Sequence, residues 1–327
     1  MRLAVYNIEW FDKLFEKDNS LKTDTESRQR LTAIAEVIAT LKPDILGVVE
    51  APNHMNNGSK KTTACLQNFS SQFNLNLSRS LIGFPSPGQQ EIAVMFNPQV
   101  CQLSHNPDGS GKKNPPFNES FEFDTDDDRI KEVYKFYRPP LELDVNEVAT
   151  GKVFKLIIAH TKSKGIFSAV DMLHWQRENE RNRRKLFAEC NWIRRRVDSL
   201  LENNYSVVVM GDINDGPGMD QYEFQFGRSA VEIIMGDIFQ PDRLLQSHVG
   251  RPKWKAGGWV PSSTRFKDRF TETNINVLID HILVSHDLAV QVDSHRVWNP
   301  YQLDEARAIR SALKKASDHY PVTIDLL

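Results

Sequence analysis

The segment SVVVMGDIND, residues 206–215, joins a continuous apolar run to a polar turn. A short apolar run of this kind predicts a strand at residues 206–210. Asp212 and Asn214 follow that strand directly. Functional groups are often held in loops that a rigid scaffold positions. We therefore predict that this turn carries part of a functional site.

The same arrangement, a polar residue at or just after an apolar run, recurs along the chain. The apolar run at residues 45–49 leads into Glu50, which is a costly place for an ordinary surface charge. These residues are far apart in sequence but must converge to form one site, so we expect a single domain spanning residues 1–327. The others placed in this way are Asn7, Glu9, His160, Asp280, Asp318 and His319.

Strand patterns outnumber helix patterns. Apolar residues at three- and four-residue spacing predict helices at residues 26–41 and within residues 171–203. The strands are too closely spaced for a regular alternation of strand and helix. We therefore expect an α/β sandwich of two packed mixed or antiparallel sheets flanked by helices. Strands are predicted at residues 3–8, 45–49, 92–96, 133–136, 141–145, 153–159, 206–210, 277–284 and 322–326.

Composition narrows the class of protein without choosing a substrate. The 327 residues are 40% hydrophobic and 26% charged, as in an ordinary globular chain, and the formal charge of -2 gives no global field for nucleic acid. Three widely spaced cysteines predict neither disulfides nor a zinc site. The sequence has no signal peptide pattern and no transmembrane segment, so we expect a cytoplasmic protein. No segment indicates a protein partner.

The polar residues at the strand ends match the needs of phosphoester hydrolysis. That reaction requires a cation near the phosphoryl oxygens, an activated water, and donors for the developing charge. Glu9, Glu50 and Asp318 offer hard oxygen ligands without cysteine or clustered histidine nearby in the sequence. This ligand type favours Mg²⁺ or Mn²⁺ over zinc.

Six ordered motifs carry a resemblance to a known family. They are YNIEWF at 6–11, PDILGVVE at 43–50, AHTKSK at 159–164, GDIND at 211–215, LIDHILVS at 278–285 and SDHYPV at 317–322. In this order they resemble the motifs of the endonuclease/exonuclease/phosphatase superfamily across nearly the whole chain. The resemblance implies a deoxyribonuclease I-like fold, a four-layer sandwich with two sheets between helices.

The resemblance also implies roles for these residues. Glu50 matches the principal metal ligand, with Asn7, Glu9 and Asp318 around the same ion directly or through water. Asp212 and Asn214 match the pair that activates water and holds a phosphoryl oxygen. His319 matches the histidine that faces the scissile phosphate, and Asp280 the carboxylate that orients it.

Two further matches concern the branch of the family. His160 resembles a second histidine of the deoxyribonuclease-like and sphingomyelinase-like branches, and Glu91 is the candidate to support it from a preceding strand. Arg138 resembles an arginine that contacts phosphate. His281 neighbours Asp280 but is expected to point to the opposite face of its strand.

Three functions follow as alternatives. The first is a metal-dependent, nuclease-like phosphodiesterase. The second applies the same chemistry to a lipid, sugar or other small phosphoester. The third is a non-catalytic binding module on the same fold. DNA or RNA could lie along the basic helix face at residues 177–196 or the basic and aromatic segment at 253–270. A solvated helix face and a locally packed or lipid-docking segment are the alternatives.

Overall fold

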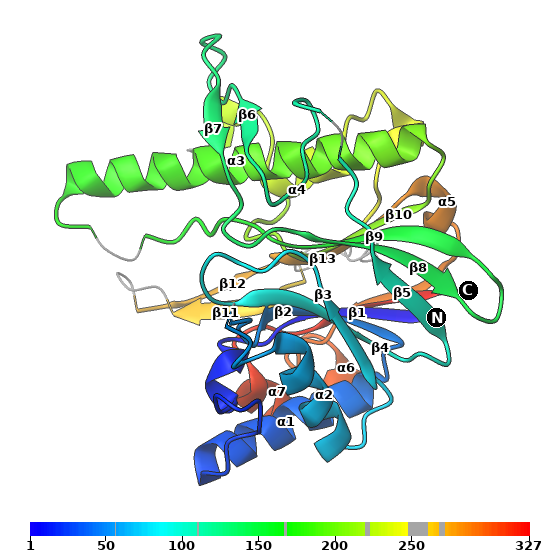
Figure 1. Cartoon of the computed structure of the whole chain (residues 1–327). Coiled ribbons are helices and arrows are strands. Elements are labelled where there is room, and N and C mark those ends of the chain that lie inside the picture. The colour runs from blue at the N-terminus through cyan, green and yellow to red at the C-terminus, as the bar shows by residue number, and fades with distance from the viewer. Residues whose placement is uncertain (56, 110, 167–168, 220–222, 248–260, 268–271) are drawn as a thin grey trace.

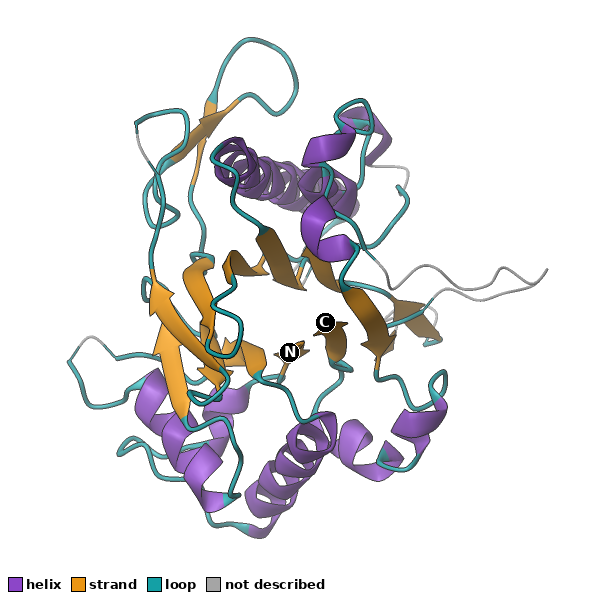
Figure 2. Ribbon diagram, turned by 90° about the vertical axis from the view of Figure 1, so that its right-hand side faces the viewer, coloured by secondary structure: helices purple, strands orange, loops and turns teal. Residues whose placement is uncertain are grey.

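The computed structural model describes residues 1–55, 57–109, 111–166, 169–219, 223–247, 261–267 and 272–327. Two β-sheets face each other at the centre of the molecule, and helices cover the outer face of each sheet (Figure 1, Figure 2). This is the predicted α/β sandwich of four layers. Of the segment at 253–270, residues 253–260 and 268–270 lie outside the described residues.

The first sheet brings the two ends of the chain together. Its strand order is β14-β15-β1-β2-β4-β3. β1 pairs in parallel with β2 and antiparallel with β15, so that Arg2 lies opposite Asp325. The strands are β1 (Arg2–Asn7), β2 (Ile45–Ala51), β3 (Arg79–Ile82), β4 (Glu91–Phe96), β14 (Val292–Val297) and β15 (Val322–Leu326).

The second sheet has the strand order β13-β10-β9-β8-β5. At its centre β9 and β10 are parallel, and β13 runs antiparallel to β10. The strands are β5 (Cys101–His105), β8 (Leu141–Glu147), β9 (Val153–His160), β10 (Val207–Asp212) and β13 (Asp280–Val284). Two small hairpins pair β6 (Phe121–Phe123) with β7 (Glu132–Tyr134), and β11 (Thr264–Lys267) with β12 (Asn274–Val277).

Helices form the two outer layers. α1 (Thr25–Leu41) and α7 (Arg310–Ala316) pack together beneath the first sheet, and the long helix α3 (Met172–Glu202) lies above the second sheet with α4 (Ala230–Met235) (Figure 1). The remaining α-helices are α2 (Thr62–Gln72), α5 (His286–Ala289) and α6 (Asp304–Arg307). Short 3-10 helices are η1 (Phe11–Leu14), η2 (Glu223–Phe226) and η3 (Pro241–Arg243).

Three apolar cores separate the four layers. On β1, Ala4 and Tyr6 face α1, whereas Leu3 and Val5 face the second sheet. On β10, Val208 and Met210 face the first sheet, and the alternate residues face α3. β1 and β10 are thus buried on both faces.

One predicted strand is wrong. The sequence predicts a single strand at residues 277–284, but β12 ends at Val277 and β13 begins at Asp280. The backbone N–H groups of Ile279 and Asp280 donate to Ser263 Oγ at 3.1 and 3.0 Å. These two N–H groups therefore donate to a side chain, whereas in a continuous strand they could donate to carbonyl oxygens of a neighbouring strand.

Candidate active site

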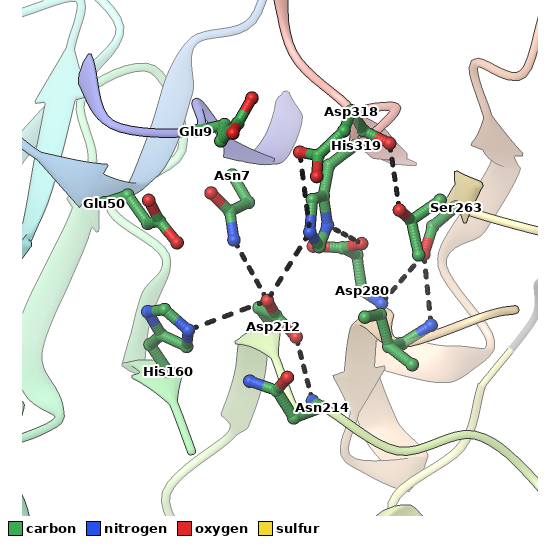
Figure 3. Close-up of polar contacts among 12 residues, drawn as sticks. Asn7, Glu9, Glu50, His160, Asp212, Asn214, Ser263, Asp280, Asp318 and His319 are labelled. Atoms are coloured by element: carbon green, nitrogen blue, oxygen red, sulfur yellow. Dashed lines mark hydrogen bonds and ion pairs between the residues drawn. The ribbon is translucent and has the colours of Figure 1, made fainter. Parts of the chain in front are cut away.

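The predicted site residues lie at one end of both sheets. Asn7 ends β1 and Glu50 lies near the end of the parallel strand β2. His160 and Asp212 end the parallel strands β9 and β10, where they lie opposite each other. Asp280 begins β13, and Asp318 and His319 precede β15. Figure 3 shows these side chains converging from the two sheets.

Asp212 lies at the centre of this group. Its Oδ2 accepts a hydrogen bond from Asn7 Nδ2 at 3.0 Å, and its Oδ1 accepts one from the backbone N–H of Asn214 at 2.8 Å (Figure 3). His160 Nε2 and His319 Nε2 lie 3.7 and 3.9 Å from Oδ2. Burial raises the pKa of Asp212 well above its ordinary value, and the charge of Asp280 raises it further. The carboxyl group is therefore held closer to neutrality than a surface aspartate.

His319 and Asp280 form a buried hydrogen-bonded pair. His319 Nδ1 donates to Asp280 Oδ2 at 2.8 Å. Burial acts to lower the pKa of His319, but the charge of Asp280 and this hydrogen bond outweigh it, and Asp212 and Asp318 add to them. The net result raises the pKa to about 10. His319 is consequently a cation at neutral pH and directs Nε2 toward Asp212.

His160 is the opposite kind of histidine. It is buried, and its Nδ1 has no hydrogen-bond partner. Burial lowers its pKa well below the ordinary value, and the charges of Arg138 and His319 lower it further. His160 therefore stays neutral beside Asp212 while His319 is charged.

Glu91 does not support His160, contrary to the sequence-based expectation. It is buried at the start of β4, where its carboxylate accepts from the backbone N–H groups of Ser86 at 2.9 Å and His54 at 3.4 Å. The physical reason is that two loop amides need an acceptor and the carboxylate satisfies both. Glu91 instead fixes the loops on either side of β4.

Oxygen ligands gather on the side of Asn7 away from Asp212. Burial raises the pKa of Glu9, and the neighbouring charges of Asp318 and Glu50 raise it further, which indicates that the three carboxylates share one region. Asn7 Oδ1 is buried without a hydrogen-bond partner. Figure 3 shows Glu9, Glu50 and Asn7 around this region.

Glu50 is held in a constrained position. Its backbone has a φ of 58°, which is unusual for a residue other than glycine. Glu50 Oε2 accepts from the backbone N–H of Trp10 at 2.8 Å and from Gln90 Nε2 at 2.6 Å, and neither bond uses Oε1. Gln90 Oε1 in turn accepts from Arg138 Nη1 at 2.6 Å. Gln90 thus ties Arg138 to Glu50.

Arg138 faces the site and is largely buried. Its Nε has no hydrogen-bond partner. Burial lowers its pKa, although the charges of Glu189, Glu50 and Asp212 oppose this effect. A buried guanidinium beside these carboxylates gives the site a fixed cation with donors to spare.

Two sets of acidic and histidine side chains among the described residues come close enough to share a metal ion. One is Asp212, Asp280 and His319, and the other is Asp124, Asp126 and Asp128. In the first set, His319 Nδ1 is already hydrogen-bonded to Asp280 and the pKa of His319 is raised, both of which make its nitrogen atoms poor metal ligands. The carboxylates of Glu9, Glu50 and Asp318 influence one another electrostatically, but their oxygens are not all within 4.8 Å of one another in this structure.

Ser263 and Thr264 are part of the site's framework but carry no motif that reveals them. Ser263 Oγ fixes the backbone before and at Asp280, and its carbonyl oxygen accepts from the N–H of Tyr320 at 2.6 Å. Thr264 Oγ1 donates to the carbonyl oxygen of Asp318 at 2.9 Å. This segment therefore clamps Asp280 beside His319. The sequence shows only a short run of hydroxyl residues at 262–264, and the structure buries all three.

His281 lies away from the site. Its Nε2 is 2.9 Å from the carbonyl oxygen of Asp215, and burial lowers its pKa. This is the opposite face of β13 from Asp280, as the alternation of side chains along a strand requires.

Comparisons with known proteins agree with this geometry. The model of the Endonuclease/Exonuclease/phosphatase family matches residues 4–319. No curated protein matches the sequence.

No helix in the described part of the chain has both the length and the apolar character needed to cross a bilayer.

Solved structures show the same fold at low sequence identity. One is a 3′ phosphatase named NExo from Neisseria, bound to a product DNA hairpin; it is 16% identical, covers 100% of this chain and 99% of its own, and has a TM-score of 0.52. Truncated TDP2 from Caenorhabditis elegans is 13% identical and also has a TM-score of 0.52, covering 99% of this chain and 96% of its own.

A third similar structure is an endonuclease/exonuclease/phosphatase family protein from Bacteroides thetaiotaomicron. It is 14% identical, covers 99% of this chain and 93% of its own, and has a TM-score of 0.52. The fold, the match along nearly all of the sequence and the convergence of the six motifs at one edge of the two sheets lead to one conclusion: the chain belongs to the Endonuclease/Exonuclease/phosphatase family, whose members hydrolyse phosphoester bonds.

Proposed function

We propose that the protein is a divalent-metal-dependent phosphodiesterase of the nuclease type, which hydrolyses P–O bonds by in-line attack of water. The observation that carries this proposal is the environment of Asp212. A buried carboxyl with a raised pKa lies between a neutral histidine, His160, and a charged one, His319. Groups whose environments drive their pKa values apart are suited to acid and base roles in one reaction.

Asp212 is the proposed base. Its raised pKa brings it nearer to neutral pH, where a carboxylate accepts a proton from water most effectively. Asn7 and the backbone of Asn214 hold its two oxygens from opposite sides, which fixes the direction of the free lone pairs. Asn214 Nδ2 donates to the carbonyl oxygen of Thr161 at 3.0 Å, so the amide is held at the mouth of the site.

Positive charge for the transition state comes from His319 and Arg138. Asp280 keeps His319 protonated, so that Nε2–H can donate to a phosphoryl or leaving oxygen. Arg138 adds a fixed cation whose planar guanidinium suits phosphate oxygens. His160, as a neutral imidazole, is the second candidate for proton exchange with the leaving group.

The residues fit a divalent cation at Glu50, with Asn7, Glu9 and Asp318 as further ligands directly or through water. Asn7 Oδ1 is buried and unpartnered, and the nearby carboxylates raise the pKa of Glu9 by repulsion. A cation there would relieve both costs, and an all-oxygen donor set favours Mg²⁺ or Mn²⁺. When bound, such an ion would neutralise negative charge on the phosphoryl oxygens.

Two alternatives remain as outcomes of the test. A lipid, sugar or other small phosphoester would use the same residues with different contacts outside the site. A non-catalytic binding module is disfavoured, because Asn7 and Asp212 and the pair His319 and Asp280 are hydrogen-bonded, and His160 Nε2 lies 3.7 Å from Asp212.

The test is hydrolysis of a panel of phosphoesters with Mg²⁺ or Mn²⁺ and with excess chelator. The panel contains single- and double-stranded DNA, RNA, bis-(p-nitrophenyl) phosphate, sphingomyelin and sugar phosphates. We expect cleavage of nucleic acid that is lost with chelator, and a loss of about 100-fold or more in Glu50→Ala and His319→Ala.

Turnover of a lipid or sugar phosphate without cleavage of nucleic acid would replace the nuclease-type assignment. A protein that cleaves nothing in the panel, and that binds the same compounds unchanged by Asp212→Ala, would instead be the binding module.

A further inference from the structure

A pocket of about 450 Å³ opens beside the site, between the segment after β9 and the first half of α3. None of the proposed catalytic residues lines it. Its lining is mainly polar or charged and comes from two segments, the loop at residues 162–166 and residues 178–185 of α3. The residues are Lys162, Gly165, Ile166, Glu178, Arg181, Asn182 and Lys185.

Cations dominate this pocket. It has three basic side chains and one acidic side chain, and the acidic one, Glu178, is already paired with Arg181. Lys185 Nζ lies 3.7 Å from the buried Glu189, and Lys162 Nζ donates only to the carbonyl oxygen of Ser163, at 3.1 Å. Lys162 thus has no carboxylate partner among the described ion pairs.

The position of Lys162 is electrostatically unfavourable for its charged form. Burial lowers its pKa, and the charges of Lys185, Arg138 and Arg181 lower it further, against an opposing effect of Glu189. Like charges gathered around a half-buried lysine repel each other. A bound anion would turn that repulsion into attraction, which is the physical reason for expecting an anion in this pocket.

The pocket adjoins the proposed scissile position. Lys162 lies two residues after His160, a span of roughly 6–7 Å in extended chain. Thr161 between them is fixed at both ends: its N–H donates to the carbonyl oxygen of Asp212 at 3.1 Å, and its own carbonyl accepts from Asn214 Nδ2. The charge of Arg138 lowers the pKa of both His160 and Lys162, so Arg138 is near both residues.

The basic side chains continue along α3 away from the site. Lys185, Arg181 and Arg177 are four residues apart and so lie on one side of the helix. Eight residues of helix extend about 12 Å. A row of cations that leads outward from a phosphoesterase site suits a linear chain of phosphates better than a compact molecule with one phosphate.

We propose that the pocket of Lys162, Arg181 and Lys185 binds the phosphate next to the scissile one on an oligonucleotide strand. This inference rests on the proposed nuclease-type function and sharpens it, because it makes a second phosphate a determinant of specificity. A substrate with only the scissile phosphate leaves the pocket empty and is cleaved less efficiently.

The test compares thymidine dinucleotides that differ by one phosphate. TpT has only the internal phosphodiester, whereas pTpT and TpTp carry an additional terminal phosphate on one side or the other. We expect the wild-type protein, with Mg²⁺ or Mn²⁺, to cleave one of the two phosphorylated forms with a kcat/KM about 10-fold or more above that of TpT. The difference should lie mainly in KM.

The double variant Lys162→Ala, Lys185→Ala should reduce that ratio to about one, and Lys185→Arg should preserve it. Arg177→Ala is the matched control. It removes a cation from the same helix that does not line the pocket, so the ratio for dinucleotides should stay unchanged. Circular dichroism and thermal unfolding check that each variant is folded.

Equal kcat/KM values for all three dinucleotides would overturn the inference while leaving the proposed function intact. So would an equal loss of preference in Arg177→Ala, since it would indicate a general field rather than a pocket. If neither a dinucleotide nor the DNA and RNA of the panel is cleaved, the proposed function fails. Equilibrium binding of pTpT, TpTp and TpT then still tests the pocket: tighter binding of a phosphorylated form, lost in the double variant, supports it, and equal binding of all three overturns it.

Discussion

At the scale of single residues, two aspartates of the GDIND turn show how position decides function. Asp212 is buried. Its charged neighbour His319 lies 3.9 Å away, beyond the distance of a hydrogen bond. Asp215, three residues later, is paired with Lys164 and accepts from the N–H groups of Gly216 and Ala230. The first carboxyl is available for chemistry, and the second holds the turn in place.

This contrast gives a paired prediction. Asp212→Asn should lower kcat by about 10²–10⁴-fold, the usual contribution of a general base, with no loss of free energy of unfolding, because it removes a charge that Asp280 repels. Asp215→Asn should instead destabilise the fold by about 1–3 kcal/mol, since it breaks a buried charged pair. Kinetics on bis-(p-nitrophenyl) phosphate and urea unfolding measure the two effects. A large loss of stability in Asp212→Asn would contradict this division of roles.

Glu189, beneath the basic pocket, predicts a dependence of stability on pH. Burial raises its pKa from the ordinary 4.5 to about 7, although Lys185 and the N–H of Lys162 oppose this. Between pH 4.5 and 7 the folded protein therefore binds more protons at this group than the unfolded chain. Stability contributed by the group is present at pH 4.5 and is lost as the pH rises toward 7.

Glu189→Gln should remove that part of the pH dependence. As the pH rises from 4.5 to 7.5, the variant should become more stable relative to the wild type. The free energy of unfolding should change by about 3 kcal/mol at most in the variant's favour. Urea unfolding at several pH values measures it. A constant difference across this range would show that Glu189 does not titrate there.

At the scale of secondary-structure elements, only part of the basic residues predicted to form one face at residues 177–196 of α3 are exposed. Several of its arginines serve the fold and are not available to solvent or nucleic acid. Arg194 donates to the carbonyl oxygens of Ile234, Met235 and Arg243. Arg196 is fully buried, pairs with Glu142 and donates to the carbonyl oxygen of Pro115 at 2.9 Å. These side chains attach the helix to the layers around it.

Arg196 should therefore dominate the stability of this contact. Arg196→Ala leaves Glu142 buried without its partner and should cost about 3–5 kcal/mol of free energy of unfolding, whereas Arg177→Ala at an exposed position of the same helix should stay within about 0.5 kcal/mol. Urea unfolding measures both. The double variant Glu142→Gln, Arg196→Met should recover part of the loss, and a double variant as unstable as Arg196→Ala would contradict the explanation.

At the scale of the whole molecule, the site depends on how the two sheets pack. Asn7 and Glu50 come from the first sheet, and His160, Asp212 and Asp280 from the second. Gly47 on β2 packs tightly against the second sheet: a Cβ there would come within 2.8 Å of Met210 Cε and 3.2 Å of Ile158. The absence of a side chain lets the sheets approach.

Gly47→Val should consequently reduce activity at a distance. Overpacking should cost about 1–3 kcal/mol, and a shift between the sheets should lower kcat although Gly47 touches none of the proposed catalytic residues. Gly47→Ala should have a smaller effect, because Met210 Cε is the flexible end of its side chain. Adding Met210→Ala to Gly47→Val should restore stability and activity in part; no recovery would argue against this packing.

The order of strands and motifs could be predicted from the sequence because it depends on local patterns. Continuous apolar runs predict the central strands, and the polar residues that follow these runs in the sequence predict where the site lies. The single domain is still a prediction, supported by the pairing of β1 with β15. The split between β12 and β13 could not be predicted. It depends on Ser263, which accepts from the backbone N–H groups of Ile279 and Asp280 but belongs to no motif.

What the sequence by itself determined is therefore the family, the fold class and the set of polar residues that end the strands. Only folding decides which partner each of them has: Glu91 accepts from loop amides and not from His160, Arg194 and Arg196 of α3 are buried, and Lys162 shares a pocket with Arg181 and Lys185. The physical reason is that apolar periodicity acts over a few residues, whereas pKa shifts, ion pairs and pockets arise between segments that only folding brings together.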